Sequence, residues 1–254
     1  MNTFKLSVRD KIAYLTLNRG SSNAINSEMV HELKDMLGNL EKDEQIGGLI
    51  LTGNEGFFSA GLDLIELYNY NEAEIKQFWH DFLDLVAVFV AFKKPMISAI
   101  SGHSPAGGCV LAICSDYRIM AEGKYIIGLN EVPVGIIVPD SIFHIYAFWL
   151  GKANAYRFLM EGKLMRTQEA LEVGLVDELV DGKSLLTAAE RKMKQYLGFD
   201  WTTWQQSKIN LRTELMEKVQ ADQTATLEAM LKQWWSPSTR SILHTIIQNL
   251  QRKN

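Results

Sequence analysis

The chain has 254 residues, of which 47% are hydrophobic and 22% charged, proportions typical of a soluble globular protein with a sizeable core. A formal net charge of −4, without any basic cluster, argues against a nucleic-acid partner. The longest apolar stretch, residues 85–92, is too short to cross a bilayer, so we expect no membrane partner. Cys109 and Cys114 suggest neither a disulfide framework nor a metal site. Because no targeting segment is recognisable at the N-terminus, we expect a cytoplasmic location.

Periodicity and turn residues predict alternating strands and helices in the first half of the chain. In chain order we expect strands at 4–8 and 11–17, a loop at 18–26, a helix from 27 to about 40, a strand at 48–52, a loop at 53–61, a helix from 72 to about 92, a strand at 96–100, a helix at 105–114, and strands at 117–121 and 125–128. Ser27 is the expected cap of the first helix, and Asn71 with Glu74 predicts a capping box on the second.

Beyond residue 135 the pattern becomes mostly helical. Helices are expected at 141–150, 153–160, 167–173 and 185–196 and over most of the last fifty residues, where Ser236 and Pro237 form an N-cap and first-position pair. The sequence therefore predicts an α/β fold of strand-strand-helix units followed by a helical region.

The most informative segment combines a glycine pair with a single acid. Ser104 and Pro105 read as the N-cap and first position of a helix, which would leave free backbone N–H groups at Ala106 and Gly107. Glycine lets a ligand approach such donors closely. Glu131 follows the strand expected at 125–128. We expect its apolar neighbours Leu129, Val132 and Val134 to bury the Glu131 carboxyl, which would disfavour its charged form. Backbone donors with one carboxylate suit the removal of a proton beside a carbonyl group.

Several motifs together resemble the crotonase (enoyl-CoA hydratase/isomerase) superfamily, and within it the isomerases. They are Phe58-Ser59-Ala60-Gly61-Leu62-Asp63-Leu64, Pro105-Ala106-Gly107-Gly108-Cys109, Gly128-Leu129-Asn130-Glu131 and Gly135-Ile136-Ile137, supported by residues 23–26 and 170–177. These motifs extend over roughly residues 10–180.

The resemblance implies a crotonase-like spiral of ββα units over residues 1–195 and a helical trimerisation region over 196–254. It also implies an acyl-CoA thioester as ligand and a homotrimer or dimer of trimers. From the residues themselves we expect no metal, because no cluster of metal ligands is present, and no cofactor besides the coenzyme A of the substrate, because the glycine segments lack the spacing of a dinucleotide-binding motif.

The resemblance further assigns the site residues. The backbone N–H groups of Leu62 and Gly107 would form an oxyanion hole, and Glu131 would be the acid/base residue. The residues expected to bind the coenzyme A part of the substrate are Ala24, Ala60, Gly61, Asp63, Pro105 and Ala106.

One departure from the family pattern bears on the reaction. Hydratases of the family carry a second glutamate where this chain has Val110. One carboxyl can carry a proton between two carbons, whereas Val110 offers no hydrogen bond to hold a water beside Glu131. We therefore favour an acyl-CoA double-bond isomerase that converts a 3-enoyl-CoA to a 2-trans-enoyl-CoA.

Two other functions stay open. A hydratase or another acyl-CoA lyase or hydrolase could use Glu131 with Asp140 or a water, and a non-catalytic acyl-CoA binder is the third reading. Asp140 is more simply a helix-start residue, although related dehalogenases use an aspartate in this region as a nucleophile. His103 has no carboxylate partner in view and reads as structural. Gly107 and Gly108 could serve only close packing.

Overall fold

The computed structural model describes residues 2–252 and contains two β-sheets. The larger sheet has the order β1-β2-β3-β5-β7-β10, with β1 (Phe4–Arg9), β2 (Ile12–Leu17), β3 (Gly48–Thr52), β5 (Met96–Ile100), β7 (Tyr117–Ala121) and β10 (Glu178–Val180). The smaller sheet has the order β4-β6-β8-β9, with β4 (Gly56–Phe57), β6 (Gly102–Pro105), β8 (Ile126–Gly128) and β9 (Leu164–Arg166).

From β3 to β8, consecutive strands alternate between the two sheets, whereas β1 and β2 both lie in the larger sheet and β9 follows β8 in the smaller one. β3, β5 and β7 pair in parallel in the larger sheet, and β4, β6 and β8 pair in parallel in the smaller one. Each strand pair thus supplies one strand to each sheet before the chain continues into a helix. This arrangement confirms the predicted spiral of ββα units.

The helices complete the spiral and form the C-terminal region. They are α1 (Ser27–Lys42), α2 (Leu64–Leu67), α3 (Glu72–Ala91), α4 (Gly107–Ile113), α5 (Asp140–Leu150), α6 (Lys152–Glu161), α7 (Thr167–Glu172), α8 (Leu185–Leu197), α9 (Trp201–Val219), α10 (Thr224–Trp234) and α11 (Pro237–Gln251). Within the described residues, no helix is long and apolar enough to span a bilayer.

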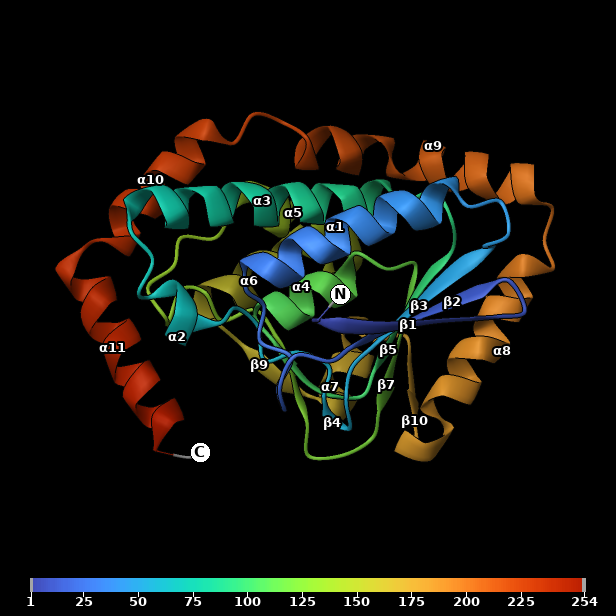
Figure 1. Ribbon diagram of the computed structural model, residues 1–254, viewed down its shortest axis with the longest axis horizontal. Helices are drawn as coiled ribbons and strands as arrows, with labels where there is room; N and C mark the ends of the chain where they lie inside the picture. The colour runs from blue at the N-terminus through green and yellow to red at the C-terminus, as the bar shows by residue number, and fades with distance from the viewer. Residues whose placement is uncertain (1, 253–254) are drawn as a thin grey trace.

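The central strands β3 and β5 of the larger sheet are buried at every residue and are mainly apolar, whereas the edge strand β1 is mostly exposed. Leu49 and Leu51 of β3 point into the main core, where α1 and α3 also pack, whereas Ile50 points into a second core against α8. Figure 1 shows α1 and α3 on one side of the strands and α8 on the other. The period-two alternation of side chains thus places one strand in both cores.

Two helix starts illustrate how local sequence sets the elements. The Asn71 side chain accepts hydrogen bonds from the N–H groups of Ala73 and Glu74, and Glu74 bonds back to the Asn71 N–H, so the predicted capping box is confirmed. The prediction of Ser27 as the cap of α1 is wrong by one residue. Asn26 is the N-cap, because its side chain accepts the Met29 N–H at 3.1 Å and Ser27 is already helical.

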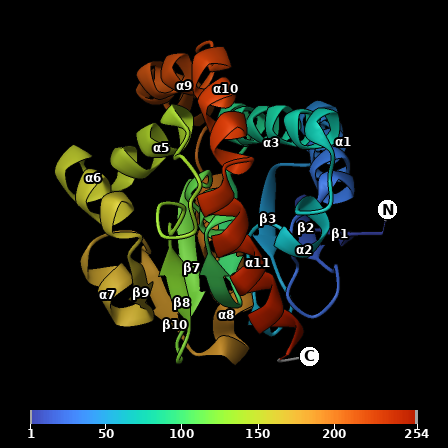
Figure 2. The same cartoon turned by 90° about the vertical axis from the view of Figure 1, so that its left-hand side faces the viewer.

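The C-terminal helices extend over the spiral and then turn down along its side (Figures 1 and 2). Buried ion pairs hold α9, because the Asp116 carboxylate lies 2.7 Å from the Lys208 ammonium and 3.0 Å from the Arg212 guanidinium. The division between residues 195 and 196 stays a prediction, and α8 continues two residues past it to Leu197.

The prediction of a helix from Pro105, capped by Ser104, is wrong. β6 continues through both residues, which pair with Ile127 and Gly128 of β8. The helix begins at Gly107, and Ala106 is its N-cap without a side-chain hydrogen bond. Strand pairing therefore overrides the local Ser-Pro signal. Pro105 is tolerated at the end of a strand, where a missing N–H removes no central bond.

Candidate functional site

Two backbone segments lie against each other where β6 passes into α4. Gly61 has φ +90°, a conformation that glycine adopts without strain. A first side-chain carbon at Gly61 would lie 3.1 Å from Ala106 Cβ and 3.2 Å from the Gly107 nitrogen. The loop at 58–63 therefore contacts the start of α4 through bare backbone, and this contact brings Leu62 and Gly107 together.

The loop's N–H groups are paired at all positions but one. The acceptors are the His103 carbonyl for Phe58 and Ser59, the Ser22 carbonyl for Ala60, the Ser59 hydroxyl for Gly61 and the Ile25 carbonyl for Asp63. Among the described residues, the Leu62 N–H has no acceptor. Because Gly61 and Asp63 both bond to Ile25, the intervening Leu62 N–H points to the opposite side of the loop.

A second donor without an acceptor lies at Gly107. Its N–H has no partner in the described part of the chain, as expected for the first residue of a helix. The Ala106 N–H, which the sequence predicted to be free, donates instead to the Gly128 carbonyl oxygen at 2.8 Å, so that prediction is wrong. Ala106 itself has φ +49°, and such strained backbone is often found at functional sites.

A cavity of about 940 Å³ opens beside these two donors. Its wall is mainly apolar and is built from the 19–24 loop, the 57–65 segment, α3, the start of α4, the 130–142 segment and α11. Leu62, Gly107, Val110 and Glu131 all line it. The residues predicted to hold the oxyanion and to act as acid/base thus lie in one cavity.

Glu131 is the one carboxyl of the described cavity wall without an ion-pair partner. Asp63, the other acid in the wall, pairs with Arg19 at 2.7 Å. Glu131 is only 7% exposed, and its Oε2 atom is buried without a hydrogen-bond partner among residues 2–252. Burial disfavours the charged carboxylate and raises the pKa of Glu131 to about 7. A carboxyl with this pKa can both accept and return a proton near neutral pH.

The burial of Glu131 was predicted from its apolar neighbours, but only part of that reasoning is right. Leu129 is fully buried, whereas Val132 is 38% exposed and Val134 is partly buried. The turn after Glu131 instead folds back, with the N–H groups of Val134 and Ile136 donating to the Glu131 carbonyl oxygen. The side chains next to Glu131 in the sequence therefore account for only part of its burial.

The residues predicted to bind coenzyme A fall into two groups. Those that line the cavity are Ala24, Ala60, Asp63, Pro105 and Ala106. Gly61 is buried and does not reach the wall, because it packs on Ala106 and Gly107.

Two residues that the sequence left ambiguous lie outside the cavity wall. Asp140 is exposed at the first position of α5, and its carboxylate accepts the Thr226 hydroxyl at 3.4 Å. The His103 ring lies between Phe57 and Tyr125, with ring centroids 5.0 and 5.3 Å away, and burial lowers its pKa. Both positions fit the structural reading.

Sequence reasoning missed two parts of the wall. Arg19 donates to the Ala24 carbonyl and pairs with Asp63 and Glu66, so it ties the 19–24 loop to α2. Ile246 and Leu250 of α11 close another side. Arg19 lies in a stretch predicted only as a loop, and α11 carries no motif, so neither had a local signal.

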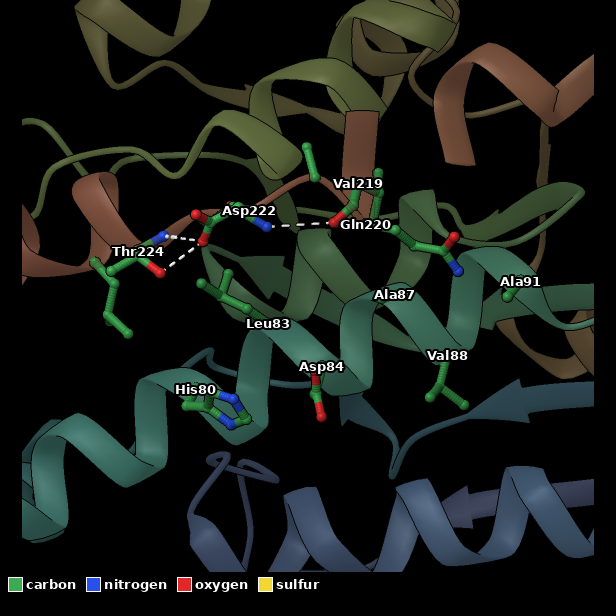
Figure 3. Close-up of a pocket in the computed structure, with 13 residues that line it drawn as sticks. His80, Leu83, Asp84, Ala87, Val88, Ala91, Val219, Gln220, Asp222 and Thr224 are labelled. Carbon is green, nitrogen blue, oxygen red and sulfur yellow. Dashed lines mark hydrogen bonds between the residues drawn. The ribbon is translucent and has the colours of Figure 1, made fainter. Parts of the chain in front are cut away.

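A second hollow, of about 450 Å³, lies between α3 and the turn that joins α9 to α10 (Figure 3). Asp222 at its rim accepts the N–H and hydroxyl of Thr224, where it helps to start α10. None of the predicted site residues lines this hollow. Among the described residues, no group of three or more His, Cys, Asp or Glu side chains could hold a metal ion.

Comparison with known proteins gives the class. The family model described as enoyl-CoA hydratase/isomerase matches residues 7–243, and the chain belongs to this family. It is an enzyme of the crotonase type, an isomerase or a hydratase.

The chain is similar to particular isomerases. It is 34% identical to mitochondrial enoyl-CoA delta isomerase 1 of Mus musculus over 95% of this chain and 84% of the mouse protein. For the Rattus norvegicus protein of the same name the identity is 36%, with the same coverage. The crystal structure of human mitochondrial delta3-delta2-enoyl-CoA isomerase superposes with a TM-score of 0.94, at 29% identity and 99% coverage of both chains.

Proposed function

We propose that the protein is an enoyl-CoA isomerase that converts a 3-enoyl-CoA thioester to the 2-trans-enoyl-CoA. One observation supports this most strongly. Within residues 2–252, the cavity has two N–H groups without an acceptor and one carboxyl without an ion-pair partner, Glu131. Its wall also has the apolar Val110 where a hydratase of the family carries a second acid. The names of the mouse, rat and human relatives agree with this choice.

In the proposed reaction the thioester oxygen accepts hydrogen bonds from the Leu62 and Gly107 N–H groups. Ionised Glu131 removes a proton from C2, and the electron pair of the C–H bond forms an enolate whose charge gathers on the thioester oxygen. Each donor aimed at that oxygen contributes on the order of 3 kcal/mol to the transition state. The Glu131 carboxyl then returns the proton to C4, so the double bond moves from C3–C4 to C2–C3 and no atom is gained or lost.

The cavity wall also favours isomerisation over hydration. Val110 is 1% exposed and has no polar side-chain atom, so a water beside Glu131 would lack a second partner there. The apolar residues of α3, Trp79 and Phe82, would hold the acyl chain away from bulk solvent. Arg19 is already paired with Asp63 and Glu66. It would therefore stabilise the cavity wall more than it would attract the phosphate groups of coenzyme A.

The assay uses purified protein, a 3-enoyl-CoA and the absorbance of the conjugated product. We expect Glu131→Gln to lose isomerisation by a factor of about 100 to 10,000, since proton transfer by a positioned side chain contributes this much. Glu122→Gln, at an exposed position, is the matched control. Faster hydration of 2-enoyl-CoA than isomerisation of the 3-enoyl-CoA would overturn the proposal in favour of a hydratase.

Two further expectations stay predictions. The homotrimer or dimer of trimers is tested by light scattering at micromolar concentration, where a monomer would contradict it. The cytoplasmic location is tested by localisation of the protein in its own cell, and the mouse, rat and human relatives are named as mitochondrial.

A further inference from the structure

Ala106 has a backbone conformation that residues other than glycine rarely adopt. Its φ is +49° and its ψ is −122°, outside the allowed regions for a residue with a Cβ atom. Among residues 2–252, the other non-glycine residues with positive φ are Asp10, Lys11 and Asn23, all of them polar. A glycine at position 106 would avoid this strain, so the methyl group of Ala106 calls for an explanation.

Backbone hydrogen bonds on both sides of Ala106 fix the strained conformation. The Ala106 N–H donates to the Gly128 carbonyl oxygen at 2.8 Å, and the Ala106 carbonyl oxygen accepts the Val110 N–H at 3.0 Å. Neither bond involves the methyl group, so a glycine at this position would form both. The methyl group is therefore not required for β6 to pass into α4.

The methyl group lies beside the two segments that carry the N–H donors. A first side-chain carbon at Gly61 would lie 3.1 Å from Ala106 Cβ and 3.2 Å from the Gly107 nitrogen, so both atoms face Gly61. A first side-chain carbon at Gly107 would lie 3.3 Å from Leu62 Cδ2. Ala106 is partly exposed and lines the cavity. It therefore borders the space in which the thioester oxygen is proposed to bind.

Ala106 and Val110 form a continuous apolar edge of the cavity. They are four residues apart and joined by the bond from the Val110 N–H, so they lie on the same face of α4, one turn from each other. Both line the cavity, as does Glu131. A buried water needs two or more polar partners, and neither of these two side chains provides one.

We propose that Ala106 is a specificity-determining residue, whose methyl group keeps water out of the space between the Gly107 N–H and Val110. This inference rests on the proposed function. A water in that space would compete with the thioester oxygen for the Gly107 N–H. Its oxygen could also bond to C3 of the 2-enoyl product while a proton goes to C2, which gives a 3-hydroxyacyl-CoA. Exclusion of this water explains why an alanine occupies a position whose backbone suits glycine.

The test is Ala106→Gly, which removes the methyl group and relieves the strain. Isomerisation of a 3-enoyl-CoA and hydration of the 2-enoyl-CoA are measured on the same purified protein. We expect the ratio of hydration to isomerisation to rise about tenfold or more, the usual effect of one carbon in an apolar pocket. The melting temperature should be equal or higher, because the strain relieved exceeds the entropy that a glycine adds to the unfolded chain.

Two further variants separate water exclusion from other causes. Ala112→Gly makes the same replacement in α4 at a fully buried position outside the cavity wall, and must leave the ratio unchanged. Ala106→Ser retains the strain but adds a hydroxyl that can hold a water, so the ratio must rise without a gain in melting temperature.

An unchanged ratio in Ala106→Gly or in Ala106→Ser overturns the inference. A lower melting temperature of Ala106→Gly also overturns it, because the methyl group would then serve packing. Failure of the proposed function would appear in the parent protein, as hydration faster than isomerisation. Failure of this inference leaves the parent an isomerase, so the two results are distinguishable.

Discussion

The Ala106 N–H donates to the Gly128 carbonyl oxygen at 2.8 Å and joins the two segments that carry the candidate chemistry. Gly107 follows Ala106 directly, and Glu131 lies three residues after Gly128. This backbone hydrogen bond therefore fixes the position of the Gly107 N–H relative to Glu131. Because strand pairing between β6 and β8 makes this bond possible, the geometry of the site depends on the smaller sheet.

Gly61→Ala should damage both stability and activity. Its φ of +90° strains an alanine, and the added carbon would lie 3.1–3.2 Å from Ala106 and Gly107. We expect a loss of about 1–2 kcal/mol in the free energy of unfolding and at least a tenfold drop in kcat/KM, since the two N–H donors move apart. Gly38→Ala in α1, where nothing lies within 4 Å, should instead stabilise by about 0.5–1 kcal/mol. Urea unfolding and the isomerase assay test both variants. Equal changes in stability and in kcat/KM for Gly61→Ala and Gly38→Ala would contradict the special role of Gly61.

The raised pKa of Glu131 predicts a pH-dependent cost in stability. Its folded pKa of about 7 lies above the ordinary 4.5, so the folded state holds this proton more tightly than the unfolded chain. The contribution of protonated Glu131 to the free energy of unfolding is therefore fully present below pH 4.5 and is lost as the pH rises through 7. Glu131→Gln should be more stable than the parent by on the order of 3 kcal/mol at pH 8, because 2.5 pH units at 1.36 kcal/mol each are removed. Unfolding curves at pH 4 and pH 8 check this, and a gain that does not grow with pH would refute it.

Asp116→Ala should loosen α9. The carboxylate serves two buried cations, Lys208 and Arg212, and its removal leaves both without their ion-pair partner. Breaking a buried pair from one side costs about 3–5 kcal/mol of unfolding free energy. Asp116→Ala with Lys208→Met removes one of the stranded charges and should recover part of this loss. A double-mutant cycle by chemical denaturation gives the result, and strictly additive losses would show that the pair is not coupled.

Neighbouring isoleucines of α11 should separate ligand binding from stability. Ile246 lines the cavity and is partly exposed, whereas Ile247 is 8% exposed and packs against the protein. Ile246→Ala should raise the acyl-CoA Kd about 5- to 30-fold, through about 1–2 kcal/mol of lost apolar contact, with little effect on unfolding. Ile247→Ala should mainly lower the melting temperature. Calorimetric titration with an acyl-CoA and thermal unfolding measure the two effects, and reversed effects would contradict the placement of α11.

Sequence reasoning succeeded where the signal is local. Asn71 and Glu74 bond within one helical turn, so their spacing alone predicts the capping box that the structure contains. The succession of strands and helices follows in the same way from hydrophobic periodicity. Ser104 and Pro105 carry an equally clear local signal, but pairing with Ile127 and Gly128 keeps them in a strand. Such long-range bonds leave no trace in the nearby sequence.

In the candidate site, too, features with a local sequence signal were predicted and features that depend on long-range contacts were not. Glu131 and the glycines belong to recognisable motifs, and the cavity brings Leu62, Gly107 and Glu131 together. The expected burial by Val132 was wrong, because that side chain points outward.

The cavity wall draws on residues from Arg19 near one end of the chain to Leu250 near the other. A ribosome must therefore synthesise and release the chain beyond Leu250 before a binding-competent pocket can exist. Ligand affinity therefore reports whether α11 is present and folded. Any nascent or proteolysed fragment that ends before α11 would lack one wall of the cavity. An acyl-CoA that binds only the finished protein should also protect all these segments from unfolding at once.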